Sequence, residues 1–310
     1  ADYFYEKREG IYIEQQSITS VVGLNFARQL NIGKMKNEGF DMSLEYNQNV
    51  NKDLFLSARG NLTYNVNTKL YDDKPTPVWP YQEEAGFVWG QQMGLVALGL
   101  FESEEDIYNS PEQLFGEVRP GDVKYKDING DGVIDNKDRI AIGYHDVPQI
   151  TYGFGVSAGW KNFDLSVFFQ GNAKATRFIG GSNFHGTINN KLGLGQIYAE
   201  VADGRWTLEN PDPNAKYPRM SMAVSSNNMQ NSTMNQRDVS FMRLKNLDFG
   251  YTLPRELTKK YGMSTVRIYM QGVNLFTFSK FKLWDPELNT DTGNRYPNMK
   301  VINFGLNINF

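Results

Sequence analysis

The stretch TYGFGVSAGWKNFDLSVFFQG, residues 151–171, decides the fold because it reads as two strands joined by a tight turn. Apolar residues occupy every second position from Tyr152 to Trp160 and again from Phe163 to Phe169. A period of two puts alternate side chains on opposite faces of a β-strand. Lys161-Asn162 supplies the two-residue turn between them. The stretch therefore predicts a β-hairpin with one apolar and one polar face, in which Gly153 and Gly155 relieve crowding.

The same alternation extends along the chain in both directions. It is clear from Phe40 to Asn47, from Leu54 to Val66 and from Ile302 to Phe310. Together these segments predict about eight antiparallel strands. They lie near residues 3–13, 26–48, 54–68, 150–160, 163–174, 238–253, 265–276 and 299–310.

The connections between these strands alternate in length. Short turns are expected near Asn49–Asp53, Lys161–Asn162 and Pro254–Met263. Short periplasmic turns and longer extracellular loops are typical of bacterial outer-membrane barrels. An even number of strands then places both chain ends on the periplasmic side. The long, irregular loops, expected to be extracellular, are residues 15–25, 70–149, 175–236 and 278–298.

Composition agrees with a membrane barrel. The mean hydropathy is −0.52, and the sequence has no apolar run of the roughly 20 residues that a transmembrane helix needs. A membrane strand can look hydrophilic, because only every second residue meets lipid. Soluble β-sandwich strands usually have about 5–6 residues, whereas these are longer. Aromatic residues beside the short turns fit an interfacial girdle: Tyr46, Trp160, Phe163 and Tyr251. The sequence thus predicts an all-β, antiparallel transmembrane barrel that crosses the outer membrane several times.

Several classes of function are disfavoured. The formal charge of −3 without basic blocks argues against nucleic acid as a partner. The chain has no Cys and only His145 and His185, both in predicted loops, so a catalytic triad has little to build on. The inward carboxylates are expected to wet a polar lumen. We therefore expect no enzyme and no catalytic residues.

Six stretches, in this order, resemble SusC-like (SusC/RagA-type) TonB-dependent outer-membrane transporters of Bacteroidetes. The resemblance covers nearly the whole chain. It implies that the chain is the C-terminal part of a barrel of about 22 strands, which an N-terminal plug closes. The stretches are NIGKMKNEGFD (31–41), PGDVKYKDINGDG (120–132), WKNFDLSVFFQG (160–171), FMRLKNLDFGYTLP (241–254), QGVNLF (271–276) and DPE (285–287).

The resemblance also implies a function. Such transporters import a nutrient, expected to be an oligosaccharide with peptide as the alternative, beneath a SusD-like surface lipoprotein that acts as a lid. The TonB complex energises them. The chain opens directly on a strand-like segment, so we expect the signal peptide, the plug, the TonB box and the first strands to lie before Ala1.

Two other interpretations stay open: an autonomous small outer-membrane barrel with a structural or adhesive role, and a soluble calcium-binding β module. In an autonomous barrel, residues 3–13 must pair with residues 299–310. In a transporter segment they pair with strands outside this chain.

Residues 127–138, DINGDGVIDNKD, have the spacing of an EF-hand calcium loop. Gly132 permits the sharp turn at position 6, and Asp138 replaces the usual bidentate Glu at position 12, as in dockerin-type loops. We expect a structural calcium ion here; the alternative is a surface turn held by Asx hydrogen bonds. The predicted ligands are Asp127, Asn129, Asp131, Val133 through its carbonyl, Asp135 and Asp138.

Loop tryptophans are candidates for stacking on sugar rings, although packing of the loops is their more common role. Arg205-Trp206, ahead of Asn210-Pro211, also resembles a family landmark. Phe310 ends an alternating strand and resembles the terminal aromatic residue that serves outer-membrane barrels as an assembly signal. The four candidates for contacting cargo are Trp79, Trp89, Trp206 and Trp284.

Overall fold

Eight long strands form one antiparallel sheet in the computed structural model, which describes residues 1–18, 23, 28–185, 197–221 and 225–310. The sheet order is β1-β2-β3-β10-β11-β14-β15-β16, so each strand lies beside its neighbours in the sequence. These strands are β1 (Asp2–Glu14), β2 (Gln29–Asn49), β3 (Leu54–Tyr71), β10 (Ile150–Trp160), β11 (Phe163–Ala173), β14 (Phe241–Thr252), β15 (Thr265–Ser279) and β16 (Val301–Asn309).

All eight predicted strands are confirmed, with small differences at their ends. β14 begins at Phe241 rather than at 238, because 236–238 form a separate strand, β13, that pairs with β12. Residues 26–27 of the second predicted strand lie outside the described residues. The alternation of apolar side chains was therefore sufficient to find every strand of the large sheet.

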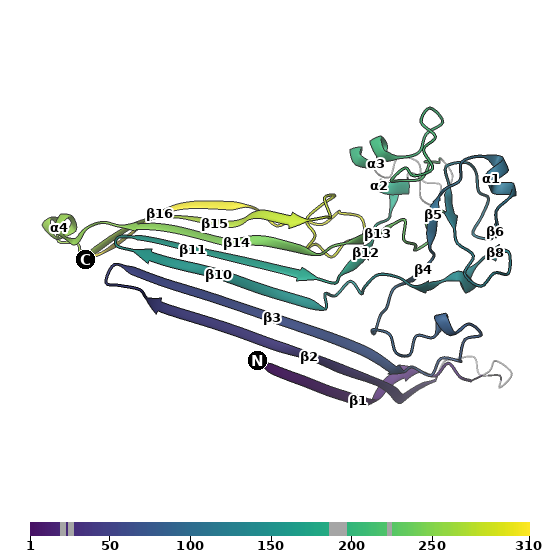
Figure 1. The fold of residues 1–310 in the computed structure, drawn as a ribbon, viewed down its shortest axis with the longest axis horizontal. Coiled ribbons are helices and arrows are strands. Elements are labelled where there is room, and N and C mark those ends of the chain that lie inside the picture. Colours follow the sequence, from purple (N-terminus) through teal and green to yellow (C-terminus); the bar gives the residue numbers. More distant parts are fainter. Residues whose placement is uncertain (19–22, 24–27, 186–196, 222–224) are drawn as a thin grey trace.

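Short and long connections lie at opposite ends of the sheet (Figure 1). The short turns follow β2, β10 and β14, and the last contains the helices α4 (Arg255–Thr258) and η4 (Lys259–Tyr261). At the β10–β11 turn Lys161 adopts a left-handed φ of 53°, which suits the twist of a two-residue hairpin. The C-terminus lies at this end, and the long loops gather at the other. The predicted alternation of connections is confirmed.

The sheet is open. Among the described strands, β1 pairs only with β2 and β16 only with β15. The pairing of residues 3–13 with 299–310 that an autonomous barrel requires is therefore not formed. No helix among the described residues has the length and apolar character needed to cross a membrane.

The two faces of the sheet differ in chemistry. Cross-strand partners such as Phe40 and Tyr64 place the apolar positions of neighbouring strands on one face. This face is uncovered: Leu44 is 71% exposed and Phe304 is 80% exposed. A continuous exposed apolar face is rare on soluble proteins and suits contact with lipid. The opposite, inner face carries the polar positions.

Most of the buried hydrophobic residues lie in the loops rather than in the sheet. The loops predicted as irregular contain short elements and four two-stranded sheets, because several segments pair with one another. We call this set of loops the loop layer (Figure 1). Its elements are η2 (Pro80–Gln82), β4 (Met93–Gly94), β5 (Ala97–Leu100), α1 (Glu104–Tyr108), β6 (Glu112–Gln113), β7 (Val123–Tyr125), β8 (Val133–Ile134), η3 (Asn136–Asp138), β9 (Ile140–Ala141), β12 (Thr176–Phe178), α2 (Ser182–His185), α3 (Ala199–Gly204) and β13 (Gln236–Asp238).

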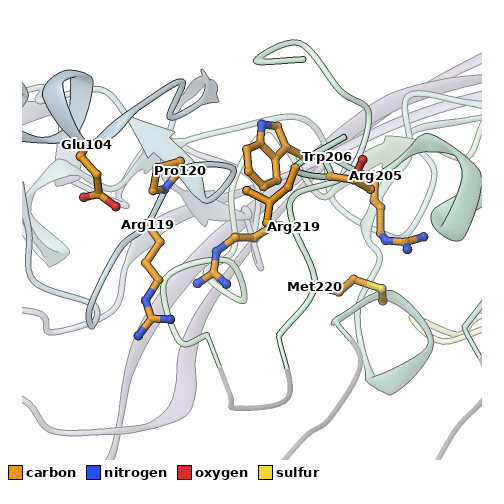
Figure 2. Close-up of a pocket in the computed structure, with 9 residues that line it drawn as sticks. Glu104, Arg119, Pro120, Arg205, Trp206, Arg219 and Met220 are labelled. Atoms are coloured by element: carbon orange, nitrogen blue, oxygen red, sulfur yellow. The ribbon is translucent and has the colours of Figure 1, made fainter. Parts of the chain in front are cut away.

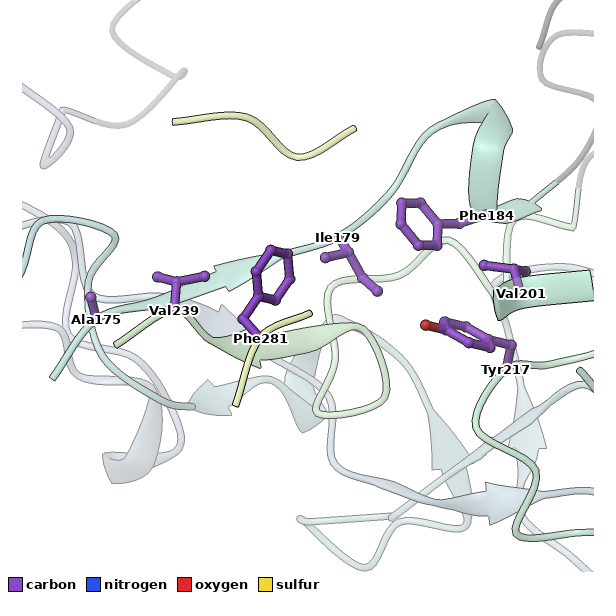
Figure 3. Packing of buried hydrophobic residues seen from close by; sticks show 7 residues of the cluster. All are labelled: Ala175, Ile179, Phe184, Val201, Tyr217, Val239 and Phe281. Carbon is purple, nitrogen blue, oxygen red and sulfur yellow. The ribbon is translucent and has the colours of Figure 1, made fainter. Parts of the chain in front are cut away.

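Two hydrophobic clusters hold the loop layer together. The first joins three predicted loops (Figure 3). The second joins loop 70–149 to loop 175–236. Because residues far apart in the sequence share one core, the loops form a packed layer. The first cluster contains Ala175, Ile179, Phe184, Val201, Tyr217, Val239 and Phe281, and the second Leu95, Leu100, Val123, Tyr125, Ile134 and Trp206.

Candidate functional site

On the inner face near the short turns, charged side chains pair with one another. Arg267 of β15 forms ion pairs with Asp164 and Asp248 on neighbouring strands. Gln271 donates to the Asp248 carboxylate at 2.6 Å. The Arg267 guanidinium also lies 5.1 Å from the ring centroid of Tyr269. The charges at this level are therefore satisfied within the sheet itself.

Further toward the loops, the Phe168 ring lies across two glycines of β10. A Cβ on Gly153 would lie 2.8 Å from Phe168 Cζ, and one on Gly155 would lie 2.9 Å from Phe168 Cδ2. Arg59 covers the ring from β3, with Cζ 4.9 Å from its centroid. The expectation that these glycines relieve crowding is confirmed, since larger residues would displace the ring.

Beside Phe168 the inner face forms a cavity of about 380 Å³, which we call the inner-wall bowl. Asn61 and Gln170 are the cross-strand partners of Gly153, so one amide lies on each side of a position without a side chain. Thr151 and Asn172, which also pair across strands, line the bowl at the next level. Two phenylalanines and one carboxylate complete the lining: Phe168, Phe241 and Glu287.

A buried arginine fastens the last long loop over the inner face. Arg243 is 2% exposed and forms ion pairs with Asp285 and Glu287, the latter at 2.8 Å. Asn298 Nδ2 donates to the same Glu287 oxygen at 2.8 Å. A buried guanidinium needs such partners, since an unpaired buried charge is strongly destabilising. Two of the sequence landmarks, 241–254 and 285–287, thus meet in this contact, which we call the Arg243 strap.

A second contact joins the landmarks 120–132 and 205–206. Gly121 has a φ of +86°, and a Cβ there would collide with the Trp206 ring. The next residue, Asp122, is fully buried. Its carboxylate pairs with Arg219 Nε at 2.8 Å and accepts from Asn228 Nδ2 at 2.7 Å. The turn, the indole and the ion pair therefore interlock two loops.

Next to this contact lies a cavity of about 510 Å³. Figure 2 shows that Arg119 and Arg219 extend to the same side, whereas Arg205 extends toward Met220. Arg119 is already paired with Glu117, and Arg219 with Asp122. Two of the three guanidinium groups are therefore neutralised by carboxylates of this chain.

The predicted calcium ligands all lie in one exposed turn. Asp127 accepts from the backbone N–H groups of Gly130 at 2.6 Å and Gly132 at 2.9 Å. Asp138 is fully buried, and its two oxygens accept from the N–H groups of Ile128 and Asp135, each at 2.8 Å. These are Asx-type bonds, the alternative that the sequence left open.

Lys137 neutralises part of the charge of this turn. Its ammonium lies 3.1 Å from Asp135 Oδ2 and 3.6 Å from Asp131 Oδ2. The hydrogen bond and the charge of Asp135 raise the pKa of Lys137 above its usual value. The hydrogen bond from Asn129 lowers the pKa of Asp131. Within the part of the chain that the structure describes, no group of three or more His, Asp or Glu side chains is arranged to hold a metal ion.

The four candidate tryptophans do not converge. Trp206 is buried in the second cluster. Trp284 packs edge-on against Phe281, with ring centroids 4.9 Å apart. Trp89 lies under the Lys69 ammonium at 5.4 Å. These contacts are those of loop packing rather than of one shared platform.

Trp79 differs from the other three because it is tied to the acidic turn. Its ring stacks on Tyr81 with centroids 6.2 Å apart. The Tyr81 hydroxyl donates to the Lys137 carbonyl at 2.7 Å, and Gln82 donates to the same carbonyl at 3.1 Å. Segment 79–82 is therefore docked on the turn. Phe310 is exposed and follows the end of β16.

No protein-family model matches the chain. It is similar to TonB-dependent receptor P3 of Formosa agariphila, with 31% identity over 90% of this chain and 29% of the relative. It is also similar to TonB-dependent receptor SusC of Bacteroides thetaiotaomicron, with 26% identity over all of this chain and 30% of the relative. The chain thus spans about a third of the length of these curated relatives.

A solved structure gives the same result at the level of the fold. The structure of the RagAB peptide transporter superposes with a TM-score of 0.68 at 25% identity. The match covers 98% of this chain and 32% of the solved chain. The open sheet and its loop layer are therefore shared, almost in full, with one part of a larger transporter chain.

Proposed function

Since the chain is a SusC-like barrel segment related to TonB-dependent receptors, we propose that it forms part of the wall of a TonB-dependent nutrient importer. The observation that carries this proposal is the open eight-stranded sheet with an apolar outer face and a polar inner face. The relatives are named as receptors and a transporter, in agreement with the expectation of a non-enzymatic protein.

The open edges support a larger barrel in the outer membrane. In lipid an unpaired strand edge leaves backbone N–H and C=O groups unsatisfied, at a cost of several kcal/mol for each group. We propose that β1 and β16 pair with strands outside this chain in a barrel of about 22 strands. The short turns then face the periplasm, and the loop layer lies outside the cell. In this arrangement Phe310 is the assembly signal at the periplasmic end.

The loop layer is the surface on which a SusD-like lipoprotein lid would dock. Its two clusters give it the fixed shape that a stable interface needs, because docking then orders few additional side chains. We propose an oligosaccharide cargo, with peptide as the alternative that the RagAB title names for that transporter. The TonB complex would act through the part of the protein outside this chain.

Uptake measurements test this function. Deleting the gene should abolish growth on one oligosaccharide or peptide nutrient, and a TonB deletion should abolish growth on the same nutrient. A lipoprotein should co-purify with the full-length protein in mild detergent. Unchanged growth of both deletion strains on a panel of glycans and peptides, together with purification of the transporter alone, would contradict the proposal.

We also propose that residues 127–138 bind a structural calcium ion. The EF-hand spacing and the positive φ of Gly132, +83°, at the predicted sharp turn support it. Burial, and then the charges of four aspartates of this turn, raise the pKa of Tyr81, so their negative potential converges on segment 79–82. A calcium ion would take the place of Lys137 as the neutralising charge and would draw the carboxylates together.

Calcium addition to the full-length protein tests this site. Extracellular sites have Kd values on the order of 10⁻⁴–10⁻³ M, and calcium at tenfold Kd should stabilise the turn by about 1.4 kcal/mol. Hydrogen exchange should slow in residues 79–82 and 127–138. Asp127→Ala with Asp131→Ala should remove this response, whereas Glu209→Ala in another loop should keep it. No calcium effect in the wild type would sink the proposal.

A further inference from the structure

We propose that the inner-wall bowl holds one neutral sugar residue of the cargo. This inference rests on the proposed import function and adds a binding site to the barrel wall itself. The bowl lies on the inner face, beneath the Arg243 strap, where loop 278–298 contributes Glu287 to its rim.

The polar side chains of the bowl have no partners. Within the described residues, the amides of Asn61, Gln170 and Asn172 make no hydrogen bond, and Asn172 Oδ1 is buried without one. A buried polar atom left unpaired costs about 1–3 kcal/mol. Three such amides around one cavity are therefore a reason to expect a ligand that supplies their partners.

The contrast with the rest of the inner face supports this assignment. Nearer the short turns, Arg267, Asp164 and Asp248 satisfy one another. The hydroxyls of Ser157 and Ser166 are bonded to each other at 2.9 Å. The bowl is thus a place where the wall offers donors and acceptors that it does not use itself.

The chemistry of the bowl fits a neutral, hydroxyl-bearing ring. Each amide offers both donors and an acceptor, and each sugar hydroxyl does the same. Phe168 and Phe241 give apolar walls. Glu287, the carboxylate at the rim, is already paired with Arg243 and Asn298. A charged ligand would lose its hydration without gaining a free counter-charge.

An extended peptide fits this place less well. Peptides commonly bind by adding a strand to an open sheet edge, where unpaired backbone groups give affinity. In the bowl the backbone groups of β3, β10 and β11 are already used in the ladder between these strands. Only side chains are available, and they surround a compact space of about 380 Å³.

Calorimetry on the purified full-length transporter tests the proposal. The probes are the hexasaccharides of glucose, mannose, galactose and xylose, and a neutral octapeptide. Asn172→Ala should raise the Kd of the best-binding hexasaccharide about fivefold, as loss of one hydrogen bond implies. The double variant Asn61→Ala/Gln170→Ala should raise it roughly 20-fold if the two losses add. Asn307→Ala, on the inner face of β16, is the matched control and should leave it unchanged.

Three results would overturn the proposal: an unchanged Kd in the double variant, binding of the octapeptide but of no hexasaccharide, or a structure of the full transporter in which a plug side chain fills the bowl. The import function is judged separately. TonB-dependent uptake with an unchanged Kd in the variants removes the bowl and keeps the importer. Weakened binding in the variants with TonB-independent uptake does the reverse.

Discussion

At the scale of single residues, Arg243 fixes the position of a whole loop. Its guanidinium is buried between two carboxylates that lie more than forty positions away along the chain. Arg243→Leu removes the charge and leaves Asp285 and Glu287 facing an apolar group. We expect this to destabilise the strap by about 3 kcal/mol, as breaking other buried ion pairs does.

Hydrogen exchange of residues 280–298 measures this effect directly, since it reports local opening. Arg243→Lys keeps the charge but cannot reach both carboxylates in a fork, so it should fall between wild type and Arg243→Leu. Arg255→Leu, at an exposed position of the β14–β15 turn, is the control. Equal exchange in all four proteins would show that the strap does not depend on this ion pair.

A single methyl group at Gly121 tests the second interlock. Gly121→Ala must bear both a left-handed φ of +86° and a collision with Trp206. Gly86→Ala bears a similar φ of +96° with no atom within 4 Å of the new Cβ. The strain alone costs about 1 kcal/mol, and the collision adds about 1–3 kcal/mol. Trp206 fluorescence and exchange of residues 119–125 should change in the first variant and stay near wild type in the second.

At the scale of elements, a strand of the sheet has two faces that tolerate different residues. Leu44 and Ser43 are neighbours on β2 but belong to the outer and inner faces. Leu44→Arg places a charge in lipid, at a cost of about 2–4 kcal/mol near the bilayer midplane. Ser43→Arg places the same charge on the polar face. The amount of folded, heat-modifiable transporter in outer membranes should fall for the first variant only.

The strands were predictable because alternation is a local signal, and each strand carries it independently. The loop layer was not, since its elements of two to six residues form only through contacts with distant segments. β6, for example, pairs in parallel with β8, which belongs to the same acidic turn as the predicted calcium site. The motif was visible in the sequence; the strand that it supports was not.

The candidate site was predictable only in part, for the same reason. Trp206 and Trp284 were recognised as loop aromatics, but their burial depends on partners from other loops. The bowl depends on register: Asn61 and Gln170 are 109 residues apart and meet only because both pair with Gly153. Two landmarks that looked separate, 241–254 and 285–287, turned out to be the two halves of the Arg243 strap.

At the scale of the whole molecule, the open sheet predicts which strand ends are neighbours. The chain has no cysteine, so introduced pairs report cleanly. Tyr5→Cys with Glu38→Cys should cross-link in the full-length protein, because these residues are direct partners of β1 and β2. Tyr5→Cys with Phe304→Cys should not, because β1 and β16 lie at opposite edges. Efficient cross-linking of the second pair would restore the small closed barrel.

The distribution of buried residues has a consequence for the order of assembly. The loop clusters join Leu95 to Trp206 and Ala175 to Phe281, each pair more than a hundred positions apart along the chain. Closing such large loops from a free chain is entropically costly, and the cost grows with the length enclosed. Once the strands are registered, the ends of every loop are fixed at one rim, and the remaining search is short. Insertion into the bilayer is therefore the nucleation event, and the surface that meets the outside world condenses last.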